Sequence, residues 1–190
     1  MNSTLRIDDF LFLRVLDPSE GQALYAVVDA NRQHLREWLP WVDQTRGPAD
    51  SRQFIERLHV AFEGRQAAHY GIFRGGELVG MVGFHAFDWT NRVTSLGYWL
   101  AAAACGTGIM RRSVGGCLGE AFRVGLNRIS IRCATGNIRS RRIPESLGFT
   151  FEGLQRQAEW LNGRYVDLEV HSLLADEWRP HLVASSVRSR

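Results

Sequence analysis

The segment RISIRCATGNIRSRRIPESLGFTFEG, which runs from Arg128 to Gly153, changes its hydrophobic period twice. RISIRCA alternates apolar and polar residues, and this period of two predicts a strand. IRSRRIPESLG predicts a short helix that closes on Gly148, because glycine is favoured just past the end of a helix. FTFEG then opens a second strand. The segment therefore predicts a strand, a helix and a strand in direct succession.

A glycine-containing corner precedes this segment. YWLAAAACGTGIMRR, Tyr98 to Arg112, predicts a strand that turns into a helix at Gly106 and Gly108. The free N–H groups and the dipole of a helix N-terminus bind phosphate, and glycine lets the backbone approach it closely. The glycine spacing fits neither of the two common nucleotide-binding motifs. The corner alone is compatible with a plain turn or with a phosphate cradle, to which Thr107 and the following arginines would add contacts.

The rest of the chain predicts a mixed α/β sheet with helices on both faces. Apolar residues at helical spacing predict two helices early in the chain, and the period then changes to two. Gly75-Gly76 and Asn162-Gly163 are hairpin signals between pairs of strands. We expect strands at 10–16, 69–74, 77–87, 92–100, 128–134, 149–161 and 165–175, and helices at 17–35, 48–64, 109–125 and 138–148.

Composition sets limits on the class of protein. The 190 residues are 45% apolar and 23% charged, which suits one globular domain with a sizeable core. We expect that domain at residues 1–180 and a frayed tail at 181–190. No stretch reaches the roughly 18 apolar residues of a membrane span, so we expect no membrane association and a cytoplasmic location. The net charge of +3 does not call for direct nucleic-acid binding.

The three cysteines, Cys105, Cys117 and Cys133, lie far apart in the sequence and form no C-x-x-C pair. Their spacing predicts neither a disulfide framework nor a zinc site, and we expect no bound metal. Cys133 is a candidate nucleophile for a two-step transfer. It shares one face of its strand with Ile129 and Ile131, however, which favours a buried structural cysteine.

The opening segment resembles the signature of the GNAT acetyltransferases, in which a strand is followed by N-x-x-S-x-x-x-x-E-x-L-G-F-x-x-E-G. The glycine corner then resembles the pyrophosphate loop of that family, Q/R-x-x-G-x-G/A, although Cys105 and Met110 depart from it at the first and last positions. The matching residues of the signature are Asn137, Ser140, Glu145, Leu147, Gly148, Phe149, Glu152 and Gly153.

Two further segments narrow this resemblance. QAEWLNGRYVD (Gln157–Asp167) and HLREWLPWVD (His34–Asp43) are similar to the RimJ/RimL-type branch, which acetylates protein N-termini, ribosomal proteins among them. The resemblance extends from about Leu11 to Trp178 and is specific as a set rather than motif by motif.

The resemblance implies the GNAT fold, with a mixed and mostly antiparallel sheet of about seven strands, about four helices and a splayed strand at the acetyl-CoA site. Acetyl-CoA would be the co-substrate. A backbone N–H near Leu100 would polarise the thioester carbonyl. The residues that would bind acetyl-CoA are Trp99, Leu100, Cys105, Gly106, Thr107, Gly108, Ile109, Met110, Arg111, Asn137 and Arg142.

Two residues carry the chemistry in this interpretation. Ser140 matches the serine that donates a proton to the leaving thiolate, and Glu159 matches the carboxylate that accepts the proton of the amine. Structural interpretations stay open for both: Ser140 is also a plausible helix-capping hydroxyl, and Glu159 a solvated carboxylate on a strand. Asn137 matches a residue that contacts the pantetheine arm, or it simply turns the chain.

The acceptor is expected to be an amine that is easily deprotonated. An α-amino group, with a pKa of about 7.7–8.0, is neutral far more often near pH 7 than a lysine side chain, with a pKa of about 10.4. A single carboxylate therefore suits a peptide N-terminus. His34, Trp38 and Trp41 are candidates for the wall of a peptide groove, although the tryptophans also suit the core.

Three functions remain open from the sequence. The first is Nα-acetylation of a peptide or protein. The second is acetylation of a small amine, such as an antibiotic or a polyamine, for which a closed acidic pocket would be the sign. The third is a non-catalytic acyl-CoA-binding module, suggested by Cys105 and the run Ala101–Ala104. By analogy with relatives, a homodimer is possible.

Overall fold

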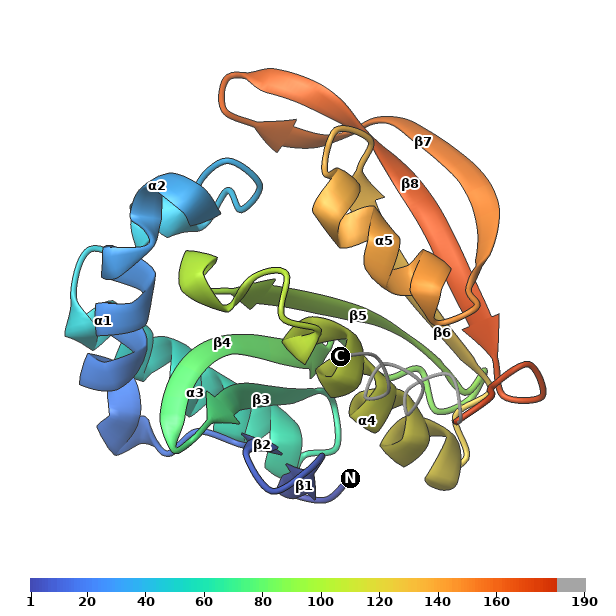
Figure 1. Cartoon of the computed structure of the whole chain (residues 1–190), viewed down its shortest axis with the longest axis horizontal. Coiled ribbons are helices and arrows are strands. Elements are labelled where there is room, and N and C mark those ends of the chain that lie inside the picture. Colours follow the sequence, from blue (N-terminus) through green and yellow to red (C-terminus); the bar gives the residue numbers. More distant parts are fainter. Residues whose placement is uncertain (181–190) are drawn as a thin grey trace.

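The computed structural model describes residues 1–180, and the predicted tail at 181–190 lies outside them. Figure 1 shows the order of the elements along the chain. The strands are β1 (Thr4–Arg6), β2 (Leu11–Arg14), β3 (Ala68–Arg74), β4 (Glu77–Phe84), β5 (Val93–Leu100), β6 (Arg128–Ala134), β7 (Thr150–Leu161) and β8 (Arg164–Leu174). The α-helices are α1 (Gly21–Ala30), α2 (Arg32–Leu35), α3 (Pro48–Glu63), α4 (Ile109–Arg123) and α5 (Ile138–Ser146).

All eight strands of the described residues join one sheet in the order β1-β2-β3-β4-β5-β6-β8-β7. Every neighbouring pair is antiparallel except β5 and β6, which are parallel. The mixed, mostly antiparallel sheet predicted from the sequence is therefore confirmed. Two short elements exceed the expected number: the three-residue β1, which pairs with β2, and α2, which the sequence merged with the preceding helix.

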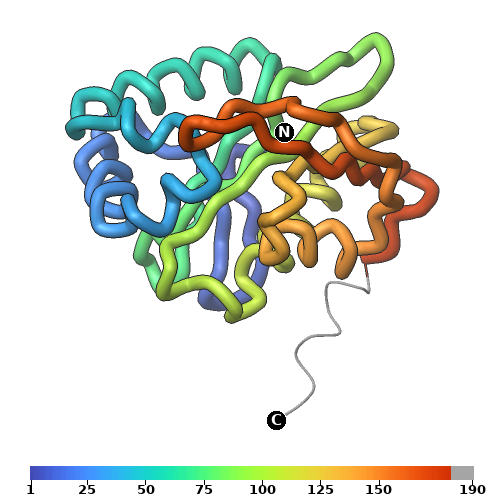
Figure 2. Tube along the Cα trace, turned by 90° about the horizontal axis from the view of Figure 1, so that it is seen from above, coloured from blue at the N-terminus to red at the C-terminus, as the bar shows by residue number. Residues whose placement is uncertain are grey.

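The two predicted hairpins form where the sequence placed them. Gly75 and Gly76 have φ of +58° and +89°, and Asn162 and Gly163 have φ of +51° and +80°. These left-handed conformations suit glycine and asparagine, and they let two-residue turns follow the twist of the flanking strands. Figures 1 and 2 show that the β7–β8 hairpin projects from the sheet toward the segment that follows α1.

The core lies in two layers, one on each face of the sheet. One cluster gathers Leu96 and Leu100 of β5 with side chains of α4 such as Val114. The second cluster gathers side chains of α1 and α3 with Met81 of β4 and Trp99 of β5. Successive residues of a strand point to opposite faces, so β5 contributes to both layers. Among residues 1–180, no helix is both long and apolar enough to cross a bilayer.

β5 and β6 separate after a short parallel contact, and this separation positions the site. They pair only at Val93–Ser95 of β5 and Arg128–Ser130 of β6. Beyond Ser95, β5 continues alongside β4 to Leu100, while β6 continues alongside β8 to Ala134. The two strands therefore diverge toward their carboxyl ends, as the splayed strand of the resemblance implied.

Gly80 of β4 gives a test of how tightly β5 is held. A Cβ atom at Gly80 would lie 2.9 Å from the Cα atom of Leu100 and would also overlap the Trp99 carbonyl. We expect Gly80→Ala to lower the free energy of unfolding by about 1–3 kcal/mol, because the backbone of β5 would have to shift. Gly119→Ala is the control: its Cβ meets nothing within 4 Å in α4, so it should stabilise by up to about 1 kcal/mol. Urea unfolding of both variants measures the difference, and an unchanged Gly80→Ala midpoint would contradict the expectation.

Candidate active site

The glycine corner forms an open loop in front of α4. Gly106 and Gly108 have φ of +77° and +76°, and a Cβ atom at either position would meet nothing within 4 Å. Gly108 directly precedes α4, whose first N–H groups have no preceding carbonyl to bind. The loop therefore combines exposed backbone donors, a helix dipole and open space, which fits the pyrophosphate of a nucleotide.

Most side chains in and after the loop contact the protein itself. The Thr107 hydroxyl donates to the Ala104 carbonyl at 2.7 Å, so it closes the loop. Ile109 and Met110 are buried in the core, which explains why a large apolar residue is accepted where the family pattern has a small one. The Arg112 guanidinium pairs with Asp8. Phosphate binding would therefore depend mainly on the backbone of the loop.

Cys105 has a partner that the sequence did not suggest. Its Sγ atom lies 3.7 Å from Nε2 of His34, on the segment after α1. This contact places His34 against the loop. His34 does not line the cavity that Ser140 and Glu159 share.

Two further predicted ligands of the coenzyme lie on helices. Arg111 is half-buried at the start of α4, and Arg142 is exposed on α5.

The edge of β5 offers backbone donors to the gap between the diverging strands. The Ala101 N–H donates to the Val79 carbonyl of β4 at 2.8 Å. Because N–H groups alternate sides along a strand, those of Tyr98 and Leu100 point the other way, toward the gap. This geometry supports the interpretation of a polarising N–H at Leu100.

Ser140 and Tyr98 meet across the gap. The Ser140 hydroxyl donates to the Tyr98 hydroxyl at 3.2 Å, and the Tyr98 hydroxyl donates to the Ser140 carbonyl at 3.0 Å. The helix cap belongs to Asn137, whose Oδ1 accepts the Ser140 N–H at 3.1 Å. Ser140 is therefore not the capping residue, and its hydroxyl is free of the backbone of α5. Burial raises the pKa of the Tyr98 phenol, so it stays protonated at neutral pH.

One cavity of about 790 Å³ connects these groups with the face of the sheet that α1 and α3 cover. Of the predicted site residues, it is lined by Trp38, Trp41, Trp99, Asn137, Ser140 and Glu159. The loop residues from Cys105 to Arg111, together with His34, Leu100 and Arg142, lie outside this lining. The residues in the lining that the sequence analysis missed include Tyr98, His69, His85 and Arg132.

Glu159 reaches the cavity because β7 is interrupted. The register with β8 shifts between Gln155 and Glu159, and Gln157 in the bulge has φ of +49°. The Gln157 N–H donates to Asp167 at 2.8 Å, which fixes the bulge. Burial raises the pKa of the Glu159 carboxyl above its usual range, and the Arg132 guanidinium partly opposes this shift. The carboxyl is therefore a stronger base than an exposed glutamate.

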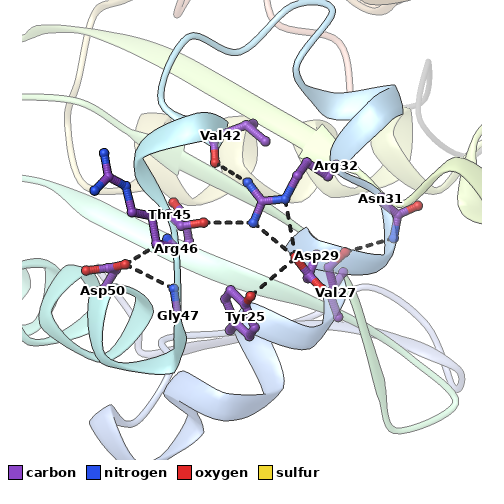
Figure 3. A network of polar contacts seen from close by, with 10 residues as sticks. All are labelled: Tyr25, Val27, Asp29, Asn31, Arg32, Val42, Thr45, Arg46, Gly47 and Asp50. Atoms are coloured by element: carbon purple, nitrogen blue, oxygen red, sulfur yellow. Dashed lines mark hydrogen bonds and ion pairs between the residues drawn. The ribbon is translucent and has the colours of Figure 1, made fainter.

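The aromatic wall is held by a polar network around Arg32 (Figure 3). The Arg32 guanidinium donates to the Val42 carbonyl at 2.7 Å and to the Thr45 carbonyl at 2.8 Å, and it pairs with Asp29. These bonds fix the segment that carries Trp38 and Trp41. Trp41 packs against Trp99, with ring centroids 6.1 Å apart, so it belongs both to the core and to the cavity.

The cavity is closed on one side by contacts between distant segments. The Asn162 side chain, at the tip of the β7–β8 hairpin, donates to the carbonyls of Arg36 and Glu37 at 3.0 and 3.3 Å. The ring of Trp38 reaches toward Gly136, where a Cβ atom would lie 3.2 Å from it. The wall from α2 and the wall from β6, β7 and β8 therefore meet above the diverging strands.

The missed residues left only weak signals in the sequence. Tyr98 and Ser140 are 42 residues apart, and nothing local predicts their contact. His69, His85 and Arg132 lie on or beside strands whose register decides which residues meet. Alternation along a strand predicts a face but not the neighbour on the next strand.

Comparison with known proteins gives concordant results. A family profile described as "Acetyltransferase (GNAT) domain" matches residues 11–150. YdaF of Bacillus subtilis (strain 168), provisionally named a ribosomal N-acetyltransferase, is 32% identical over 180 residues, which are 92% of this chain and 97% of YdaF.

Two solved structures are also similar. The ribosomal α-N-protein acetyltransferase RimL, in complex with coenzyme A in a disulfide with a cysteine, superimposes with a TM-score of 0.89 at 29% identity, over 92% of this chain and 99% of RimL. The microcin self-immunity acetyltransferase MccE, in complex with acetyl-CoA and AMP, gives a TM-score of 0.88 at 26% identity, over 92% of this chain and 97% of MccE.

Proposed function

This chain belongs to the GNAT acetyltransferase family, and from that membership we propose that it acetylates the α-amine of a peptide or protein N-terminus. It is an acetyl-CoA-dependent N-acetyltransferase of the ribosomal-protein acetyltransferase type. RimL is named for the α-amine of ribosomal proteins, whereas MccE is named for immunity to microcin. These two names point to different acceptors, and the lining of the cavity distinguishes between them.

The charge balance of the cavity carries the proposal. Among the described residues, its lining contains two carboxylates, Asp50 and Glu159, and two guanidiniums, Arg57 and Arg132. A polyamine carries several positive charges and would need a clearly acidic pocket. A peptide N-terminus carries one amine on a largely neutral chain, and tryptophan and backbone groups suit it. This lining supports a peptide over a polyamine.

The residues have separate parts in the transfer. The loop at Gly106 and Gly108 would bind the pyrophosphate of acetyl-CoA, and the N–H of Leu100 would polarise the thioester carbonyl. The amine attacks that carbonyl, and Glu159 accepts the proton that the amine loses. The Ser140 hydroxyl, which is hydrogen-bonded to the Tyr98 hydroxyl, donates a proton to the departing thiolate. Arg142, Arg111 and Asn137 would add contacts to the coenzyme.

We infer that the thiol of coenzyme A lies close to Cys133. In the RimL complex, coenzyme A is joined to a cysteine by a disulfide. Cys133 lies in the cavity lining here, together with Ser140 and Asn137. A coenzyme thiol beside Cys133 would therefore also lie beside Ser140, where the proton is needed.

A matched pair of peptides tests the acceptor directly. One peptide has a free α-amine and arginine in place of every lysine, and the other has a blocked N-terminus and one internal lysine. We expect release of coenzyme A, followed with a thiol reagent, only with the first peptide. Transfer only to the lysine peptide, or only to a polyamine, would contradict the proposal.

Direct transfer predicts that Cys133→Ala keeps most of its activity. Burial raises the pKa of the Cys133 thiol to about 11, so almost no thiolate exists at neutral pH. The neighbouring Glu169 cannot easily activate it, because its carboxylate is engaged by Arg141 at 3.1 Å and by His171 at 3.2 Å. We expect kcat to change by less than about threefold. A loss above about a hundredfold in a folded variant would instead favour a covalent intermediate on Cys133.

A further inference from the structure

His85 presents an unsatisfied imidazole to the cavity. It directly follows β4, lines the cavity and is exposed. Within residues 1–180, its ring nitrogens make no hydrogen bond, although its backbone carbonyl accepts one from Thr94. The ring of His69, on β3, meets it edge to face, with centroids 5.7 Å apart. The polar group is therefore held in place yet available to a ligand.

Two glycines make the space for this pair. His69, Gly83 and Gly97 lie in one row across β3, β4 and β5. A Cβ atom at Gly83 would overlap the His69 ring, and one at Gly97 would lie 2.8 Å from Nε2 of His85. The imidazoles therefore lie against bare backbone, with Nε2 of His85 above Gly97. A larger residue at Gly83 would displace the His69 ring, and one at Gly97 would displace the His85 ring.

Gly97 lies where the reaction is expected. The last paired residue of β5 before the strands diverge is Ser95, so Gly97 stands at the apex of the gap. Tyr98, which binds Ser140, is its neighbour on the opposite face of β5. His85 therefore approaches this stretch of β5 from the face that α1 and α3 cover. Tyr98 meets Ser140 on the opposite face.

The groups around His85 favour its neutral form. The surrounding protein removes part of the hydration of the His85 ring and so lowers its pKa, and the Arg132 guanidinium of β6 lowers it further. Burial and His85 itself lower the pKa of His69 to about 4. The other charged groups of the lining are Glu159 on β7 and Asp50 and Arg57 on α3. A neutral imidazole keeps one lone pair that can accept a hydrogen bond.

We propose that His85 is an amine-binding residue, whose Nε2 atom accepts a hydrogen bond from the acceptor amine while Glu159 takes the proton. His69 is a positioning residue that holds the ring of His85. This inference rests on the proposed acetyl transfer, but it concerns the amine itself and so applies to whichever amine the enzyme acetylates.

Two substitutions separate the hydrogen bond from the ring. His85→Leu removes the acceptor atom, and we expect KM for the amine to rise about 10- to 100-fold, with kcat within about threefold, because a hydrogen bond to a charged group is lost in the ground state. His85→Gln places an amide oxygen near the position of Nε2, and we expect it to restore KM to within about threefold. His59→Gln, on α3 outside the cavity lining, is the control for loss of an imidazole.

The pH dependence gives a second readout. In the wild type, KM should rise as the pH falls through the pKa of His85, because an imidazolium repels the ammonium of the acceptor. That rise should disappear in His85→Gln, which does not titrate. His69→Ala should raise KM in the same direction as His85→Leu, and His69→Phe, which keeps a ring against His85, should do so less.

The kinetics distinguish this inference from the proposed function. An unchanged KM in His85→Leu would overturn the inference. Equal losses of kcat in His85→Leu and His85→Gln would also overturn it, because they would make His85 a proton acceptor rather than a binding group. If the wild type acetylates a small amine and no peptide, the proposed function fails, and the same variants then test His85 on that amine.

Discussion

Glu159→Gln is expected to lower kcat/KM for a peptide α-amine by about 10²- to 10³-fold at neutral pH, while acetyl-CoA binds with unchanged affinity. The amide has nearly the shape of the carboxylate but cannot accept the proton of the attacking amine. Glu159 lines the cavity, whereas the loop at Gly106–Gly108, which we propose holds the coenzyme, lies outside that lining. Isothermal titration with coenzyme A, together with steady-state kinetics, measures the two effects separately.

The pH profile makes this prediction specific. Burial raises the pKa of Glu159, so the active carboxylate is lost as the pH falls through a value above the usual one for glutamate. The wild-type rate should therefore show an acidic limb from Glu159 and a second ionisation from the amine. In Glu159→Gln only the amine ionisation should remain, and the deficit should shrink above about pH 9, where most α-amine is already neutral.

A distant glutamate provides the control. Glu77 is exposed at the start of β4, so Glu77→Gln makes the same chemical change far from the cavity lining. Its pH profile should match that of the wild type. If Glu159→Gln also keeps the wild-type profile, the proton of the amine leaves by another route and Glu159 is not the base.

Ser140→Ala is expected to lower kcat by about 10²-fold, at the low end of the range for general acids. A thiol with a pKa near 8.5 leaves as a fair thiolate, so proton donation helps less than it would for an alcohol. Removing the hydroxyl also breaks its 3.2 Å bond to Tyr98, but the helix cap at Asn137 stays. The variant should therefore fold normally.

A double-mutant cycle tests whether Ser140 and Tyr98 act as one chain. Tyr98→Phe removes the phenol hydroxyl and should lower kcat less than Ser140→Ala does. If the two hydroxyls pass one proton in sequence, the double variant should be no slower than Ser140→Ala. Fully multiplicative losses would show that they act independently, and a normal kcat in Ser140→Ala would remove Ser140 from the mechanism.

The sequence predicted the larger part of the fold because the turns and caps are local. Gly75, Gly148 and Gly163 adopt the positive φ that their positions suggested. The three-residue β1 was missed because it is too short to show a period. Its pairing with β2 identifies it as a strand.

The site was predictable only where a motif marked it. Ser140 and Glu159 were found through the family pattern, and both line the cavity. Tyr98 and His85 escaped notice because their importance arises from contacts across strands, which depend on register. The helix cap at Asn137 and the loop closure by Thr107 needed the structure, because the sequence does not show which backbone group either side chain meets.

Intact-mass detection of acetyl transfer would show whether the protein acetylates peptide α-amines. The protein would be incubated with acetyl-CoA and a panel of short peptides that differ in their N-termini, some with internal lysine, together with polyamines and aminoglycosides. We expect one added acetyl group on free α-amines and none on blocked peptides or on the small amines. Acetylation confined to a polyamine or an aminoglycoside, or none on any amine while acetyl-CoA remains bound, would contradict it.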